Sequence, residues 1–182
     1  MQWLSEKILV LMGWEIVGQR PDEPKLVMVG YPHTSNWDLF LLLALASHFD
    51  LKVRFLAKAA LFRGPLGYFM RRWGGVPVDR SGARSLVDAA VAAFSTHDEL
   101  ILVIAPEGTR SKSSRWKSGF WRIAEAAEVP VVMAFIDGRT KRIGLSAVAK
   151  SGGDLDAWMR VAAEFYADKN GLRSANRGPV AL

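Results

Sequence analysis

A histidine and an aspartate, His33 and Asp38, lie five positions apart where a short apolar run gives way to a helical pattern. On one continuous helix this spacing would separate the side chains by about 140°, so we expect His33 in the preceding loop and Asp38 in the first turn. There the carboxylate could fix the imidazole tautomer and stabilise the imidazolium, as a general base requires. The same residues also fit a capping box, in which Asp38 bonds back to an amide near Ser35 and His33 has no task. These residues alone leave both interpretations open.

A second candidate loop follows a buried apolar run and reads Ala-Pro-Glu-Gly-Thr-Arg-Ser over residues 105–111. Gly108 permits a positive φ or a close backbone approach, and the planar fork of Arg110 matches phosphate or carboxylate oxygens. Glu107 could bind an arginine or accept a hydrogen bond from a substrate hydroxyl. The alternative is a Pro-Glu-Gly turn with a solvated arginine. Further cations continue a rim suited to anions: Lys112, Arg115 and Lys117.

Strands alternate with helices along the chain, which predicts a single α/β domain with a mostly parallel central sheet flanked by helices. We expect strands at residues 25–30, 51–57, 76–79, 100–105, 130–136 and 143–149, the last as an edge strand. We expect helices at residues 1–20, 36–48, 85–96, 119–128 and 154–170, the last capped by Asp154 and Gly171. Residues 61–75 are predicted to be mostly loop. Sites in such sheets lie where strands end, which directs attention to the two candidate loops.

The predicted organisation has three parts. Residues 1–24 form an amphipathic N-terminal helix that packs on the domain or faces a membrane. Residues 25–173 form the α/β domain. Residues 174–182 are expected to be a flexible tail, since they contain Gly178-Pro179 at the chain terminus.

Composition narrows the possible chemistry. The 182 residues are 50% apolar and 23% charged, as in an ordinary globular domain. No cysteine is present, which excludes a thiol nucleophile, disulfides, iron–sulfur clusters and cysteine-bound zinc. The formal net charge of +6 suits partners that carry phosphate, although basic side chains are equally an ordinary solubilising surface. The longest uncharged stretches fall well short of the ~20 residues of a spanning helix, so we expect a cytoplasmic chain, peripheral on a membrane, with no transmembrane span.

Four short motifs follow one another along the chain with ordered spacing. They are His33-x4-Asp38, a run from Gly75 to Arg80, Pro-Glu-Gly-Thr-Arg at residues 106–110, and Val-Pro-Val at residues 129–131. This set resembles the motifs of the glycerolipid acyltransferase superfamily, typified by the 1-acyl-glycerol-3-phosphate acyltransferases, over residues 25–136. Pro32 stands where the family often has Asn, and Ala105 where it usually has Phe. Neither departure touches a proposed catalytic group, and both suggest a subgroup with its own acceptor.

The resemblance implies a glycerol-3-phosphate acyltransferase-like fold and transfer of a fatty acyl group from an acyl thioester. His33 would take the proton of an acceptor hydroxyl, and Asp38 would hold His33 and offset its charge. The acceptor would be a lysophospholipid such as 1-acyl-glycerol-3-phosphate, in phospholipid biosynthesis, with acyl-CoA or acyl carrier protein as co-substrate and no cofactor or metal. The residues expected to hold the polar head of the acceptor are Arg80, Glu107, Gly108, Thr109 and Arg110, with Lys58 as a further candidate cation.

Residues 61–73 mix aromatic side chains with cations. Such mixtures suit the headgroup boundary of an anionic bilayer, and Trp3 and Trp14 in the N-terminal helix could join them. The alternative is that these apolar groups are core, or line a groove for an acyl chain.

Other functions remain open at this point. The acceptor could be another lysolipid or a glycolipid, or the same base could activate water in a thioesterase. A non-catalytic lipid-binding module is a further alternative. A nucleic-acid partner is not expected, because the basic residues do not follow one helix and no nucleic-acid motif is present.

Overall fold

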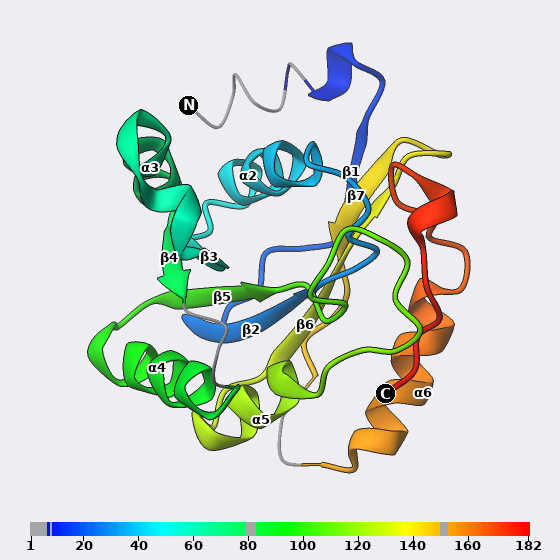
Figure 1. The fold of residues 1–182 in the computed structure, drawn as a ribbon. Coiled ribbons are helices and arrows are strands. Elements are labelled where there is room, and N and C mark those ends of the chain that lie inside the picture. The colour runs from blue at the N-terminus through cyan, green and yellow to red at the C-terminus, as the bar shows by residue number, and fades with distance from the viewer. Residues whose placement is uncertain (1–6, 8, 79–82, 150–152) are drawn as a thin grey trace.

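A central sheet dominates the computed structural model, which describes residues 7, 9–78, 83–149 and 153–182 (Figure 1). Within these residues the sheet has seven strands in the order β1-β7-β6-β2-β5-β3-β4. All neighbours are parallel except β6 and β7, which confirms the predicted α/β class with a mostly parallel sheet. The strands are β1 (Glu15–Val17), β2 (Lys25–Gly30), β3 (Val53–Lys58), β4 (Gly75–Val78), β5 (Leu100–Ile104), β6 (Val131–Asp137) and β7 (Arg142–Leu145).

Strand β2 shows that the sheet is covered on both faces. Leu26 and Met28 pack into one core cluster and Val27 and Val29 into another, and all four are fully buried. Because side chains alternate along a strand, continuous apolar runs of this kind are typical of a parallel sheet between two layers. One layer contains α2 (Asp38–His48), with α3 (Gly64–Arg72) beside it, and the other contains α4 (Ala83–Thr96), α5 (Gly119–Ala126) and α6 (Leu155–Tyr166) (Figure 1).

The N-terminal region differs from the prediction. Residues 9–11 are helical, but residues 15–17 form β1 and pair with β7, so the helix expected over residues 1–20 is wrong in its last part. Trp14, which lies between the helical residues and β1 in sequence, is buried in the core. A short apolar run fits a strand as well as a helix, and here pairing with the sheet decides. Since β1 lies outside β7 in the sheet, the expected edge position of residues 143–149 is also wrong.

Residues 61–75, expected to be mostly loop, contain the end of a 3-10 turn (Ala59–Phe62) and all of helix α3. Pro65 lies in the first turn of α3, where its missing N–H costs no hydrogen bond. Gly67 lies so close to the Phe62 carbonyl that a Cβ atom would collide with it. The glycines and the proline therefore allow this helix to form against the 3-10 turn, although in sequence they suggest a loop.

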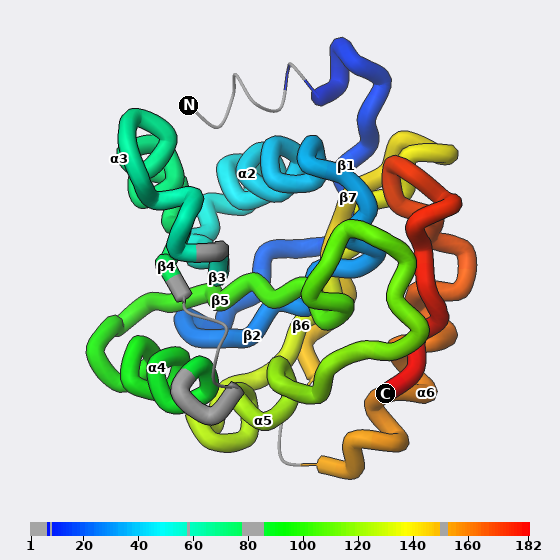
Figure 2. Tube along the Cα trace, in the orientation of Figure 1, coloured from blue at the N-terminus to red at the C-terminus, as the bar shows by residue number. Residues whose placement is uncertain are grey.

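The C-terminal residues also differ from the prediction. Asp154 caps α6 as expected, accepting a hydrogen bond from the Asp156 amide at 2.9 Å, but the helix ends at Tyr166 and Gly171 lies beyond its C-cap. Residues 174–182 are not a free tail, because they run back along the loop that follows β5 (Figure 2). The Trp116 amide donates to the Ala181 carbonyl there, at 2.5 Å. Within the described residues, no helix is long and apolar enough to cross a bilayer.

Candidate active site

The loop between β2 and α2 places His33 beside Asp38. The strand ends at Gly30 and the helix begins at Asp38, so His33 lies in the loop and Asp38 in the first turn. His33 Nδ1 is 3.0 Å from Asp38 Oδ2. A carboxylate only accepts hydrogen bonds, so Nδ1 carries the proton and Nε2 is the basic nitrogen. The Asp38 side chain is buried and that of His33 is 29% exposed, which leaves the imidazole accessible.

The same carboxylate oxygen also organises the backbone of the loop. Asp38 Oδ2 accepts hydrogen bonds from the Thr34 amide at 2.8 Å and the Ser35 amide at 2.9 Å. Ser35 Oγ in turn accepts a hydrogen bond from the Trp37 amide at 3.2 Å. The two interpretations of this motif are therefore compatible, because one buried oxygen bonds back to the amides before the helix and also holds the imidazole.

Glu107 approaches His33 from the loop after β5. The strands β2 and β5 are adjacent and parallel, so their carboxyl ends bring the two candidate loops together. Glu107 Oε1 accepts a hydrogen bond from the His33 amide at 3.0 Å. The Glu107 side chain is buried, and its Oε2 has no hydrogen-bond partner among the described residues. Burial raises the pKa of Glu107 to about 7; the amide hydrogen bond from His33 opposes this rise, and the nearby charge of Asp38 adds to it.

The rest of the second loop turns outward. Gly108 has φ of 67° and donates its amide to the Ala105 carbonyl at 3.1 Å, which closes a tight turn. Thr109 and Arg110 are exposed, and Arg110 forms no ion pair within the described part of the chain. A Cβ atom on Gly108 would lie 3.0 Å from Lys117 Nζ, so this ammonium group lies beside the turn. The turn that follows Glu107 thus presents cations.

Of the two remaining predicted cations, only Lys58 is among the described residues. Lys58 is the last residue of β3, which is separated from β2 by β5 alone. Arg80 falls outside the described residues, although β4 ends at Val78 on the same side of the sheet. The structure therefore brings His33, Asp38 and Glu107 into contact and places Gly108, Thr109 and Arg110 in the adjoining turn.

The sequence does not indicate that Thr34 and the C-terminal residues belong to the site. Thr34 Oγ1 accepts hydrogen bonds from the amides of Leu172 at 3.0 Å and Arg173 at 3.1 Å, and Thr34 is almost fully buried. Nothing in the sequence pairs positions so far apart. The only local signal is Gly171, whose φ of 69° permits the turn that carries the chain toward Thr34.

Comparison with known proteins gives this site a chemical context. The model of the family described as Acyltransferase matches residues 15–137, well over half of the chain. The chain belongs to the Acyltransferase family. A crystal structure of the 1-acyl-sn-glycerophosphate acyltransferase PlsC from Thermotoga maritima is similar in fold, with a TM-score of 0.58 and 18% identity over 90% of this chain and 74% of PlsC. No curated protein sequence matches significantly.

Family membership and the shared fold confirm the resemblance seen in the four motifs, and the protein is an O-acyltransferase. The residues that the family model matches include both candidate loops. In this acyltransferase, a buried carboxylate holds an accessible imidazole through Nδ1, and a cationic turn follows Glu107 in the adjoining loop. Such an arrangement can remove a proton from a hydroxyl next to an anionic group.

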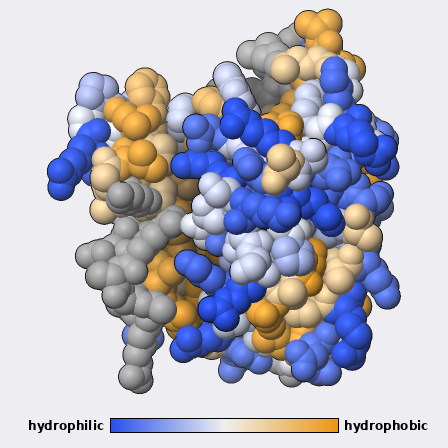
Figure 3. Space-filling model, turned by 45° about the vertical axis from the view of Figure 1, so that its right-hand side comes forward, coloured by the Kyte–Doolittle hydropathy of each residue, from blue (hydrophilic) through white to orange (hydrophobic). Residues whose placement is uncertain are grey.

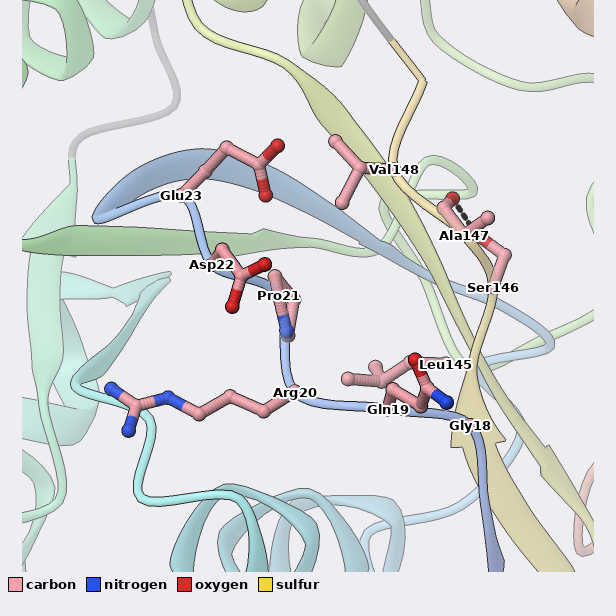
Figure 4. Close-up of a pocket in the computed structure, with 10 residues that line it drawn as sticks. All are labelled: Gly18, Gln19, Arg20, Pro21, Asp22, Glu23, Leu145, Ser146, Ala147 and Val148. Atoms are coloured by element: carbon pink, nitrogen blue, oxygen red, sulfur yellow. Dashed lines mark hydrogen bonds between the residues drawn. The ribbon is translucent and has the colours of Figure 1, made fainter.

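A hollow in the acyltransferase lies away from these loops. Its volume is about 500 Å³ and its walls are residues 18–23 and 145–148 (Figure 4). None of the residues that line it belongs to either candidate loop. The two loops are therefore the better candidate for the active site. Among the described residues, no group of three His, Asp or Glu side chains is placed to hold a metal ion.

Proposed function

We propose that this acyltransferase moves a fatty acyl group from an acyl thioester, either acyl-CoA or acyl carrier protein, to a hydroxyl of a lysophospholipid such as 1-acyl-glycerol-3-phosphate. The observation that carries the proposal is the 3.0 Å contact between His33 Nδ1 and the buried Asp38 Oδ2. It leaves Nε2 as a base in a loop at the carboxyl end of the central strand. The neighbouring fold relative, named a 1-acyl-sn-glycerophosphate acyltransferase, supports the choice of acceptor.

The chemistry follows from the protonation state of His33. Nε2 takes the proton of the acceptor hydroxyl as its oxygen attacks the thioester carbonyl carbon. Asp38 offsets the positive charge that this places on the ring. When the tetrahedral intermediate collapses, the carbon–sulfur bond breaks, an ester remains, and the imidazolium returns the proton to the departing thiolate. No covalent bond to the enzyme forms, so a cysteine is not needed.

An anionic acceptor head suits the surface beside His33. Arg110 is exposed and offers a fork for phosphate oxygens, and the Lys117 ammonium lies at the same turn. Lys58, the last residue of β3, and Arg80 are further candidates for this role. Glu107 bonds to the His33 amide and is buried, so we assign it to the support of the base and not to the phosphate.

We also propose that the enzyme binds anionic membranes through an aromatic row, which consists of Trp37, Phe40, Trp73, Phe69 and Tyr68. All of these rings are exposed except that of Trp73, which is half-buried. Consecutive ring centroids are 5.2, 6.0, 5.8 and 5.6 Å apart. The row begins next to Asp38 and crosses to α3, where Figure 3 shows apolar and strongly hydrophilic side chains side by side in the lobe at upper left. Exposed cations flank it at Arg63, Arg71 and Arg72.

This combination favours a bilayer surface as the partner, because rings enter the headgroup boundary while arginines meet anionic lipid. It would bring a lysolipid acceptor to His33 from the membrane. Trp14 has no part in such a surface, since it is buried in the core, and Trp3 lies outside the described residues.

The proposed transfer is tested by thiol release from long-chain acyl-CoA or acyl carrier protein, with and without 1-acyl-glycerol-3-phosphate. We expect release that requires the acceptor, is lost in His33→Ala, and survives in the matched control His97→Ala. His97 lies just beyond α4, and its ring nitrogen Nδ1 contacts Thr96 and the Ala93 carbonyl. Equal release without acceptor would instead establish a thioesterase.

A further inference from the structure

The last residues of the chain lie against both loops of the active site. We call residues 170–182 the C-terminal strap. In Figures 1 and 2 the strap, in red, follows α6 and returns beside the loop that joins β5 to α5. Two groups of its hydrogen bonds reach the loops of the active site, far away in sequence.

The first group converges on Thr34, the residue next to His33. Its Oγ1 accepts the amides of Leu172 and Arg173, at 3.0 and 3.1 Å. Its carbonyl accepts Asn176 Nδ2 at 3.2 Å. Its own amide donates to Asp38 Oδ2 at 2.8 Å. Thr34 is 1% exposed. Each of its polar atoms forms a hydrogen bond, either with the strap or with the carboxylate that holds His33.

The second group joins the strap to Tyr31, in the His33 loop, and to Trp116, in the loop between β5 and α5. Tyr31 donates its hydroxyl to the Gly178 carbonyl at 2.6 Å, and both residues are buried. The Trp116 amide donates to the Ala181 carbonyl at 2.5 Å. Trp116 precedes Lys117, whose amide in turn donates to the Pro106 carbonyl at 2.9 Å. The strap therefore bonds to the His33 loop on one side and to the Glu107 loop on the other.

We infer that Thr34 is a positioning residue through which the C-terminal strap holds the His33–Asp38 pair in register with the Glu107 loop. Connecting loops are by default the more mobile part of a domain, whereas a catalytic base must keep its geometry to within about 1 Å. Thr34 meets this need because its amide and its hydroxyl oxygen bond in opposite directions, to Asp38 and to the strap. The inference rests on the proposed role of His33 as the base.

The test compares Thr34→Val, which keeps the shape but removes the hydroxyl acceptor, with Thr34→Ser, which keeps the acceptor. Steady-state acyl transfer is measured well below the unfolding temperature of each variant, together with amide hydrogen exchange of peptides that cover residues 31–38. We expect kcat of Thr34→Val to fall by about ten- to a hundredfold with little change in KM, and exchange of residues 31–38 to accelerate. Thr34→Ser should restore both.

A second pair of variants keeps the inference testable if Thr34→Val does not fold. Asn176→Ala removes only the side-chain bond to the Thr34 carbonyl, and it should accelerate exchange in residues 31–38. Asn170→Ala is the matched control, because Asn170 Nδ2 bonds to the Asp168 carbonyl within the neighbouring turn and not to Thr34.

A purely structural strap would give a different result. Thr34→Val and Asn176→Ala would then lower the unfolding temperature or loosen residues 170–182, while kcat and the exchange of residues 31–38 stayed at the wild-type values; that result would overturn the inference. The exchange measurement needs no substrate. It therefore remains decisive if the wild type transfers no acyl group, an outcome that would refute the proposed function separately.

Discussion

The substitution Asp38→Asn separates the charge of the buried carboxylate from its shape. The amide oxygen of asparagine can occupy the place of Oδ2, where it still accepts hydrogen bonds from the Thr34 and Ser35 amides. What is lost is the negative charge that faces the imidazole. We therefore expect a folded protein whose base is poorly stabilised when it takes up a proton.

The size of the effect follows from the geometry. Nδ1 and Oδ2 are 3.0 Å apart and the carboxylate is buried. Unit charges about 4 Å apart attract each other by about 4 kcal/mol at an effective dielectric constant near 20. If the imidazolium carries half to three quarters of its charge in the transition state, then about 2–3 kcal/mol of stabilisation disappears, or roughly 30- to 150-fold in kcat.

The assay is acceptor-dependent thiol release with saturating acyl thioester, at a pH at which the wild type is fully active. Ser35→Ala is the matched control, since it removes the Oγ that accepts the Trp37 amide and leaves the carboxylate in place. Its kcat should stay within about threefold of the wild-type value. If Asp38→Asn is folded and also stays within that range, Asp38 does not stabilise charge on His33 and our reasoning is refuted.

Two further predictions concern a buried acid and the membrane surface. Burial raises the pKa of Glu107 from 4.5 to about 7. Between these pH values the folded state holds a proton that the unfolded state releases, so the free energy of unfolding falls as the pH rises. The total contribution of this residue is about 3 kcal/mol. In Glu107→Gln, the free energy of unfolding measured with urea should therefore fall less between pH 5 and pH 8 than it does in the wild type. An equal fall in the variant and the wild type would contradict a neutral buried carboxyl. Phe69→Ser should weaken binding to anionic vesicles about fivefold, and high salt should weaken the binding of both proteins because it screens the arginines. Val161→Ser, on the opposite helical layer, should bind as the wild type. Equal binding of both variants would argue against the aromatic row as the docking surface.

The sheet and its first loop were largely predictable because they depend on local patterns. Apolar runs bounded by glycine and proline predict the central strands, and the cap at Asp154 is visible from its position before α6. The five-residue spacing of His33 and Asp38 also limits the geometry, since these side chains cannot meet on one helix. The bond between them is formed because the helix begins at Asp38 itself.

The remaining features depend on contacts between distant residues. Nothing local distinguishes residues 15–17 from a helix, and only pairing with β7 makes them a strand. Glu107 looks like a ligand for an arginine or a hydroxyl, yet the fold brings it to the His33 amide. The role of Thr34 depends on a strap nearly 140 positions later in the chain. Composition and periodicity contain no information about such pairings.

The most direct test of acyl transfer by the His33–Asp38 pair is the identity of the lipid product. Acyl thioester and 1-acyl-glycerol-3-phosphate are incubated with wild type and with His33→Ala, and the lipids are analysed by mass spectrometry. We predict that the wild type forms an ester whose mass is that of the acceptor plus the fatty acid minus one water, and that His33→Ala does not. Free fatty acid with unchanged acceptor, or the same ester from the variant, would contradict the account.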